Sequence, residues 1–155
     1  MVHGYHVIMG MYGFWLPNDP RGSRSDFVGA WELLRFGKTT RTMKRCALIS
    51  PEEEQQRMEA KRCLKYPPVT LNGRQALAIA QAFGEFFKAN RCAVWACSVL
   101  PEHIHLVMPR HRYAVEQTAT LLKGAATRRL RTEGLDPMAG YGSCRSPWAR
   151  GRWSD

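Results

Sequence analysis

The sequence lacks paired cysteines and long apolar runs. Its five cysteines include no C-x-x-C pair, so we expect neither a zinc site nor a disulfide framework, and reduced thiols are the simple interpretation. The longest apolar stretch, residues 7–16, is far shorter than the roughly 20 residues that span a bilayer. The N-terminus shows neither the basic segment nor the cleavage site of a signal peptide. These absences predict a cytoplasmic protein without a membrane span.

Acidic residues are also scarce, with 13 against 23 basic ones and a net charge of +10. Such an excess favours a polyanionic partner, nucleic acid or an anionic membrane surface, over a merely soluble basic protein. The sequence has no basic amphipathic helix with a large aromatic face, so the membrane is the weaker choice. With 155 residues, 45% hydrophobic and 23% charged, the chain has the size and composition of a single folded domain, and we expect residues 1–155 to form one.

A His-Ile-His motif at residues 103–105 stands between two apolar segments. Residues 92–100 and 103–108 are predicted to form a hairpin closed by a tight turn. Residues i and i+2 share a strand face, so His103 and His105 are expected to point the same way, roughly 7 Å apart at Cα. Two neutral imidazoles on one face can bind a divalent metal. The alternative for the tripeptide alone is a half-exposed polar strand face.

Capping patterns mark the starts of two helices. Ser50 with Glu53, and Asn72 with Gln75, are reciprocal capping pairs. They predict one helix that begins at residue 51 and ends before residue 66, and a second that runs to about residue 90. A third helix is expected over about 115–132, ending at Gly134. The side chains expected to face inward are Leu77, Ala80, Phe83, Phe87, Leu121, Leu122, Ala125 and Leu130.

The order of elements predicts the fold class. Residues 5–14 are expected to form a buried strand and residues 147–153 a short edge strand. An insertion at about 20–66 lies between the first strand and the later elements. Its basic and aromatic residues suit either single-stranded nucleic acid or a loop packed on the core. The result is an α+β fold, a ferredoxin-like antiparallel sheet with helices on one face, and the histidine face is expected to be uncovered.

Residues 100–107, Leu-Pro-Glu-His-Ile-His-Leu-Val, resemble the histidine–hydrophobe–histidine (HUH) strand of the single-tyrosine transposases of small insertion sequences. The REP-associated tyrosine transposases are close relatives within that group. Residues 5–8, 121–128 and 147–153 resemble further segments of the family, in the same order. The resemblance covers most of the chain except roughly residues 20–66. The ordered set of four segments is much more specific than the HUH strand alone.

This resemblance implies a DNA-binding domain for cleavage and strand transfer of single-stranded or hairpin DNA through a phosphotyrosine intermediate. It implies that His103 and His105 are ligands of a divalent metal, Mg²⁺ or Mn²⁺. In the family, the nucleophilic tyrosine lies on a helix beyond the Trp-rich segment, and a third metal ligand follows it. The sequence stops at Asp155, before that helix, and none of its tyrosines matches the position. We therefore expect this chain to be inactive on its own.

The helix after the HUH strand carries a basic surface of Lys123, Arg128, Arg129 and Arg131, of which Lys123, Arg128 and Arg131 are the candidate DNA contacts. The resemblance implies that this helix lies beside bound DNA, with Lys123 as the best candidate for a phosphate contact. Arg110 and Arg150 would extend the track. The alternative is an ordinary solvated basic helix.

Several roles are left open by the sequence. Trp148 is expected to pack or to stack on bases, and His6 on the first strand could face the histidine pair as a further ligand. One competing function is a non-catalytic module that binds single-stranded DNA and has the same fold. A metal-dependent hydrolase using His103 and His105 is weaker, because the motif has no nearby set of acidic ligands. The oligomeric state is open between a monomer and a homodimer.

Overall fold

The computed structural model describes residues 3–20, 22–23, 28, 31–40, 48–142 and 145–149. The chain divides into two compact units. The first is built mainly from Met1–Tyr12 and Val69–Trp148, and the second mainly from Gly13–Pro68. The insertion expected at about residues 20–66 lies inside the second unit, whereas the histidine motif belongs to the first.

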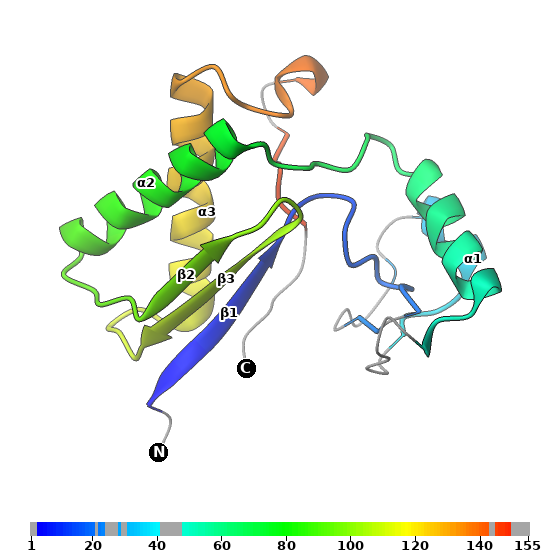
Figure 1. Ribbon diagram of the computed structural model, residues 1–155, viewed down its shortest axis with the longest axis horizontal. Helices are drawn as coiled ribbons and strands as arrows, with labels where there is room; N and C mark the ends of the chain where they lie inside the picture. The colour runs from blue at the N-terminus through cyan, green and yellow to red at the C-terminus, as the bar shows by residue number, and fades with distance from the viewer. Residues whose placement is uncertain are drawn as a thin grey trace. The chain divides into compact units, whose positions relative to one another are not determined.

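The first unit is an α+β structure around a small antiparallel sheet (Figure 1). Its strands are β1 (Gly4–Gly10), β2 (Ala96–Val99) and β3 (His103–Pro109), in the order β1-β3-β2. The central strand β3 pairs antiparallel with both neighbours. The hairpin expected around the histidine motif is therefore confirmed.

Both flanking strands are shorter than the sequence suggests. The chain turns after α2 at Arg91, which has a left-handed φ of 52°. Residues 92–95 then connect this turn to β2 and are not part of the strand. At the other edge, β1 ends at Gly10 and is followed by an isolated antiparallel bridge between Met11 and Trp148. That bridge is the described part of the edge strand expected over residues 147–153. Residues 150–153 of that expectation lie outside the described residues.

Two helices, α2 (Gly73–Ala89) and α3 (Val115–Thr132), lie side by side against the sheet (Figure 1). The capping pair that was expected to start α2 is present. Asn72 Oδ1 accepts from the Gln75 backbone N–H at 3.0 Å, and Gln75 Oε1 accepts from the Asn72 backbone N–H at 2.9 Å. The bounds of α3 agree with prediction. Gly134 follows the last turn of α3 and has a left-handed φ of 66°. Glycine adopts this conformation with little strain, so it is well suited to end a helix.

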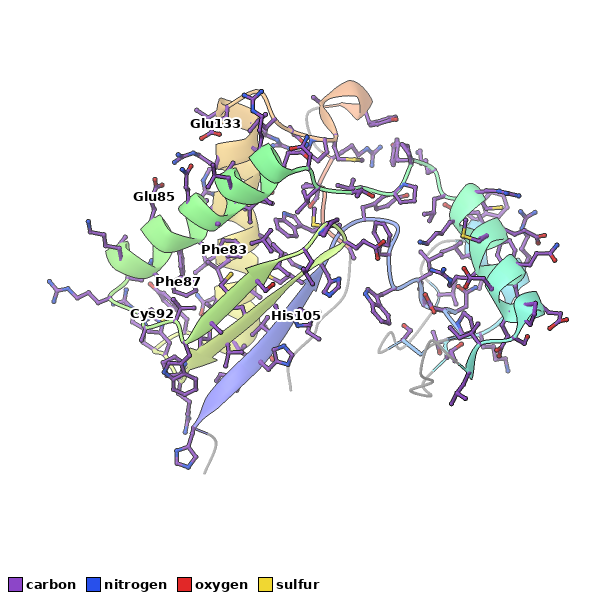
Figure 2. The ribbon with its side chains drawn as sticks, viewed as in Figure 1. Phe83, Glu85, Phe87, Cys92, His105 and Glu133 are labelled. Atoms are coloured by element: carbon purple, nitrogen blue, oxygen red, sulfur yellow. The ribbon has the colours of Figure 1, made fainter. Side chains whose placement is uncertain are left out.

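The sheet has one covered face and one open face. Alternate residues of β3 are fully buried, whereas the residues between them are only partly buried. The buried set consists of Ile104, Leu106 and Met108, with Val7 and Met9 beside it on β1. Phe83 and Phe87 point from α2 toward this face, and Glu85 points away from it (Figure 2). The helices thus cover a single face, and the histidines lie on the other.

The inward faces of the two helices were predicted only in part. Phe83, Phe87, Leu122 and Leu130 are buried as expected. The prediction was wrong for Leu77, which is 60% exposed, for Ala80 and for Leu121, which is 38% exposed. Apolar and alanine residues surround much of α2 and α3, so more than one face fits the helical period. The choice between these faces depends on the partners across the interface.

We expect Leu122→Ala to lower the free energy of unfolding by about 2–5 kcal/mol, because it leaves a cavity beneath α3. Leu122 is fully buried, whereas its neighbour Leu121 is 38% exposed. Leu121→Ala makes the same chemical change on the same helix and is expected to cost about 1 kcal/mol or less. Urea denaturation followed by circular dichroism measures both values. Equal losses in the two variants would show that the buried face of α3 has been assigned wrongly.

The second unit contains a 3-10 helix, η1 (Trp31–Phe36), and the helix α1 (Pro51–Arg62). The Ser50–Glu53 capping box predicted for α1 is present in both directions. A small core forms from Leu16, Leu33 and Ala60. Trp31 is 83% exposed, so its side chain does not belong to this small core.

Two further observations concern the chain as a whole. None of the helices in the described residues is long and apolar enough to cross a membrane. The cysteines at positions 63, 92 and 97 are free thiols, whereas Cys46 and Cys144 lie outside the described residues.

Candidate functional site

Three histidines meet on the open face of the sheet. His103 and His105 come from β3, and His6 comes from β1. His103 Nε2 lies 3.0 Å from His105 Nε2, and His105 Nδ1 lies 2.9 Å from His6 Nε2. The prediction that His103 and His105 share one strand face is confirmed, and Figure 2 shows His105 on the sheet.

The two contacts of His105 differ in geometry. The His6 and His105 rings are nearly parallel, at 16°, with centres 5.1 Å apart. A ring nitrogen lies about 1.1 Å from its ring centre, so a linear hydrogen bond of normal length would place the two centres about 5.1 Å apart. The rings therefore lie edge to edge in nearly one plane, which is the geometry of a straight N–H···N hydrogen bond.

The His103 and His105 rings instead stand at 79°, with centres only 4.7 Å apart despite a longer nitrogen–nitrogen distance of 3.0 Å. Their Nε2 atoms are thus turned away from the line that joins the ring centres. Two ligands at about 2.1 Å from one ion and at right angles to each other are about 3.0 Å apart. The separation of the two nitrogens, 3.0 Å, therefore equals that of two adjacent ligands of one ion, and it is also the length of a hydrogen bond between the rings.

The electrostatics of the site favour neutral imidazole at its centre. Burial lowers the pKa of His105, and the neighbouring His103 and His6 lower it further. Neutral imidazole is the form that binds metals. His103 Nδ1 is buried and finds no hydrogen-bond partner among the described residues.

His6 does not share the position between the other two rings. Its Nε2 faces Nδ1 of His105, on the opposite side of that ring from Nε2. In the part of the chain that the structure describes, no group of three or more His, Cys, Asp or Glu side chains is placed to hold a metal ion. The cluster thus brings two Nε2 atoms together, those of His103 and His105, and keeps the His6 ring on the other side of His105.

Lys123 lies in a less open position than the sequence suggests. Burial lowers the pKa of its ammonium group, and Nζ is 6.0 Å from the centre of the Trp148 ring. Trp148 is only 5% exposed, and its indole N–H donates to Thr127 Oγ1 at 2.9 Å. Of the two roles considered for Trp148, packing is therefore the one that the structure shows.

Two arginines of α3, Arg129 and Arg131, are paired with carboxylates, whereas Arg128 has no such pair among the described residues. Arg131 donates to Asp136 Oδ2 at 3.0 Å and to the Arg145 backbone oxygen at 2.9 Å. Arg129 contacts the carboxylates of Glu85 and Glu133. Each of these two arginines is therefore already paired with carboxylate.

Arg110, just past β3, and Arg128 on α3 are exposed and form no ion pair within the described residues. Arg150 lies outside the described residues. Of the predicted DNA-contacting arginines in the described part of the chain, Arg110 and Arg128 retain the most available charge.

Trp95 is an exposed aromatic residue that the sequence did not single out. Its side chain is 59% exposed, and its backbone N–H donates to the Val107 oxygen at 2.9 Å, next to the sheet. A Cβ atom at Gly4 would lie 2.5 Å from the Trp95 ring and 2.7 Å from the Met108 backbone oxygen, so a larger residue there would force a neighbour to shift. Gly4 is the first residue of β1, one position before the strand predicted from the sequence, and a glycine in a strand is a signal of such a close approach.

The fold and the site define a class in general terms: an α+β domain with helices on one face of an antiparallel sheet and a histidine cluster on the other. No protein-family model matches the sequence, and no curated protein matches it. The arrangement of the side chains is therefore the main guide to function.

Proposed function

We propose that this chain is an HUH-type, single-tyrosine-transposase-like domain that binds single-stranded or hairpin DNA on the histidine face of its sheet. The observation that carries the proposal is the pair of His103 and His105 Nε2 atoms, 3.0 Å apart on the sheet face opposite α2 and α3 within the first unit. The net charge of +10 supports a polyanionic partner.

The topology supports the same proposal. In the first unit the elements follow the order β1, α2, β2, β3, α3, and β3 lies between β1 and β2. The Met11–Trp148 bridge lies beyond β1, where the fourth strand of a ferredoxin-like β-α-β-β-α-β fold belongs. We propose that fold for this unit, with Mg²⁺ or Mn²⁺ as the metal and the cytoplasm as the location.

The residues of the site have distinct proposed roles. His103 and His105 would hold the ion through Nε2, and burial lowers the pKa of His105, which favours the neutral form that such binding needs. A bound divalent ion supplies charge that polarises the scissile phosphate. Arg110 would contact backbone phosphates next to the histidine face, and Trp95 would offer a face on which a base stacks. Arg128, on the exposed side of α3, would contact the phosphates of DNA that continues past the edge of the sheet onto that helix. In the transposase-like reaction, a tyrosine oxygen bonds to phosphorus and a 3′ hydroxyl leaves, so rejoining needs no external energy.

We expect the chain to bind single-stranded DNA with a strong salt dependence, because phosphate contacts release counterions. The log–log slope should be about −0.7 per phosphate contact. Arg128→Ala should make the slope shallower by about 0.7, whereas Arg129→Ala should change it little, because Arg129 is already paired with Glu85 and Glu133. Fluorescence anisotropy with a labelled oligonucleotide measures the slope for each variant. The salt concentration should range from about 50 to about 200 mM, over which such slopes are resolved.

Lack of binding at low salt, or binding that ignores salt, would refute the DNA proposal. A second candidate function is a non-catalytic single-strand-binding module with the same fold. It is favoured by the absence of a third metal ligand within the described residues. DNA binding that is unchanged by Mn²⁺, and by loss of His103, would support this second candidate.

A further inference from the structure

His6 lies outside the His-Ile-His motif, yet it is in direct contact with it. It is on β1, where Val107 is its register partner, and it reaches His105 diagonally. Diagonal neighbours on adjacent strands are within reach of long side chains. Its Nε2 is 2.9 Å from His105 Nδ1.

We propose that His6 is a positioning residue that accepts a hydrogen bond from His105 Nδ1–H and thereby directs the Nε2 lone pair of His105 toward the metal position. The inference rests on the proposed function, because it assigns a role to His6 within that same site. It adds a residue from a strand that is distant from the HUH motif in the sequence.

The first argument is the tautomer of His105. A neutral imidazole carries one N–H and one lone pair. Metal binding through Nε2 places the proton on Nδ1, and that proton needs an acceptor. His6 Nε2 is the acceptor that the structure provides, at hydrogen-bond distance from His105 Nδ1.

The second argument is the shape of the contact. The 16° interplanar angle and 5.1 Å centre separation of His6 and His105 place the N–H and the lone pair on one line. A linear hydrogen bond fixes the rotation of the ring, and once metal binding through Nε2 places the proton on Nδ1 the same bond stabilises that tautomer. The bent, nearly perpendicular contact of His103 with His105 fixes neither.

The third argument excludes His6 as a ligand in this arrangement. Its Nε2 faces the nitrogen of His105 that points away from the His103–His105 space. For His6 to reach a shared ion, its hydrogen bond to His105 would have to break and one of the two rings would have to turn.

The test compares His6→Ala with His6→Gln, whose side-chain oxygen can still accept the hydrogen bond. Long-range ¹H–¹⁵N spectra of the metal-free chain report the tautomer of His105, and isothermal titration with Mn²⁺ reports affinity. We expect the wild-type His105 to carry its proton on Nδ1. His6→Ala should lose this preference and bind Mn²⁺ about 10- to 100-fold more weakly. His6→Gln should recover most of both properties, and His3→Ala, which changes an exposed histidine before β1, should alter neither.

The outcomes separate the two proposals. A wild-type chain that binds no Mn²⁺ overturns the proposed metal site. An unchanged His105 tautomer in His6→Ala overturns the positioning role alone. If His6→Gln loses as much Mn²⁺ affinity as His105→Ala, His6 is a ligand and the positioning role is wrong.

Discussion

We expect the His105→Ala variant to lose Mn²⁺ binding, with an affinity reduced more than about 100-fold. Loss of a residue that only hydrogen-bonds to a metal ligand lowers metal affinity roughly 10- to 100-fold, so loss of a ligand itself should cost more. His105 is the central ring of the cluster and contacts both His103 and His6. His103→Ala is expected to have an effect of the same order, since it removes the other Nε2 atom. Isothermal titration or the electron paramagnetic resonance spectrum of free Mn²⁺ measures the loss.

The matched control is His111→Ala. His111 lies just past the end of β3, where its ring contacts Tyr113 rather than the cluster. This variant removes a histidine from the same chain segment and should leave Mn²⁺ affinity unchanged. Circular dichroism should be the same for all three variants, because the side chains at 103 and 105 lie on the open face of the sheet. Mn²⁺ binding that survives both His103→Ala and His105→Ala would refute the metal site.

The second large effect is an absence: we expect the purified 155-residue chain to form no covalent adduct with hairpin DNA in the presence of Mn²⁺. Under the proposed transposase-like function, the nucleophile would be a tyrosine on a helix after the Trp-rich segment, and none of the five tyrosines in the 155 residues is at that position. A denaturing gel with labelled DNA detects an adduct directly.

The structure gives further reasons why two of these tyrosines, Tyr5 and Tyr113, should not act as the nucleophile. Tyr5 pairs with Met108 in the sheet register, so it belongs to the set of residues that alternates away from the histidines. Tyr113 follows the far end of β3, and the distance from His105 to Pro109 is already about 13 Å along the strand. Its hydroxyl accepts a hydrogen bond from Arg112 at 3.2 Å.

Two other tyrosines, Tyr141 and Tyr12, are the residues to substitute if an adduct does form. Tyr141 is 42% exposed in the short 3-10 helix η3 (Ala139–Tyr141). Tyr12 comes two residues after Gly10, the register partner of His103. An adduct that survives denaturation, and that disappears in Tyr141→Phe or Tyr12→Phe, would show that a resident tyrosine acts as nucleophile. That outcome would contradict our prediction and identify the catalytic residue.

Local patterns in the sequence determined the elements of the first unit and the orientation of the motif. The Asn72–Gln75 capping pair begins α2, and Gly134 follows the end of α3. Each of these signals depends on residues within a few positions of one another. The alternation of a strand likewise placed His103 and His105 on one face. At these positions the local geometry alone was enough, because a cap and a strand alternation depend on backbone positions a few residues apart.

Only the tertiary structure decided how distant parts of the chain change the site. His6 and His105 are 99 positions apart, and their contact depends on the register of β1 against β3. The burial of Lys123 beside Trp148, and the pairing of Arg129 with Glu85 on α2, depend on how α3 packs. A sequence pattern states which side chains share an element and a face. Which of them meet, and which charges stay available for a ligand, is set by packing between elements, because burial and pairing are properties of neighbours in space.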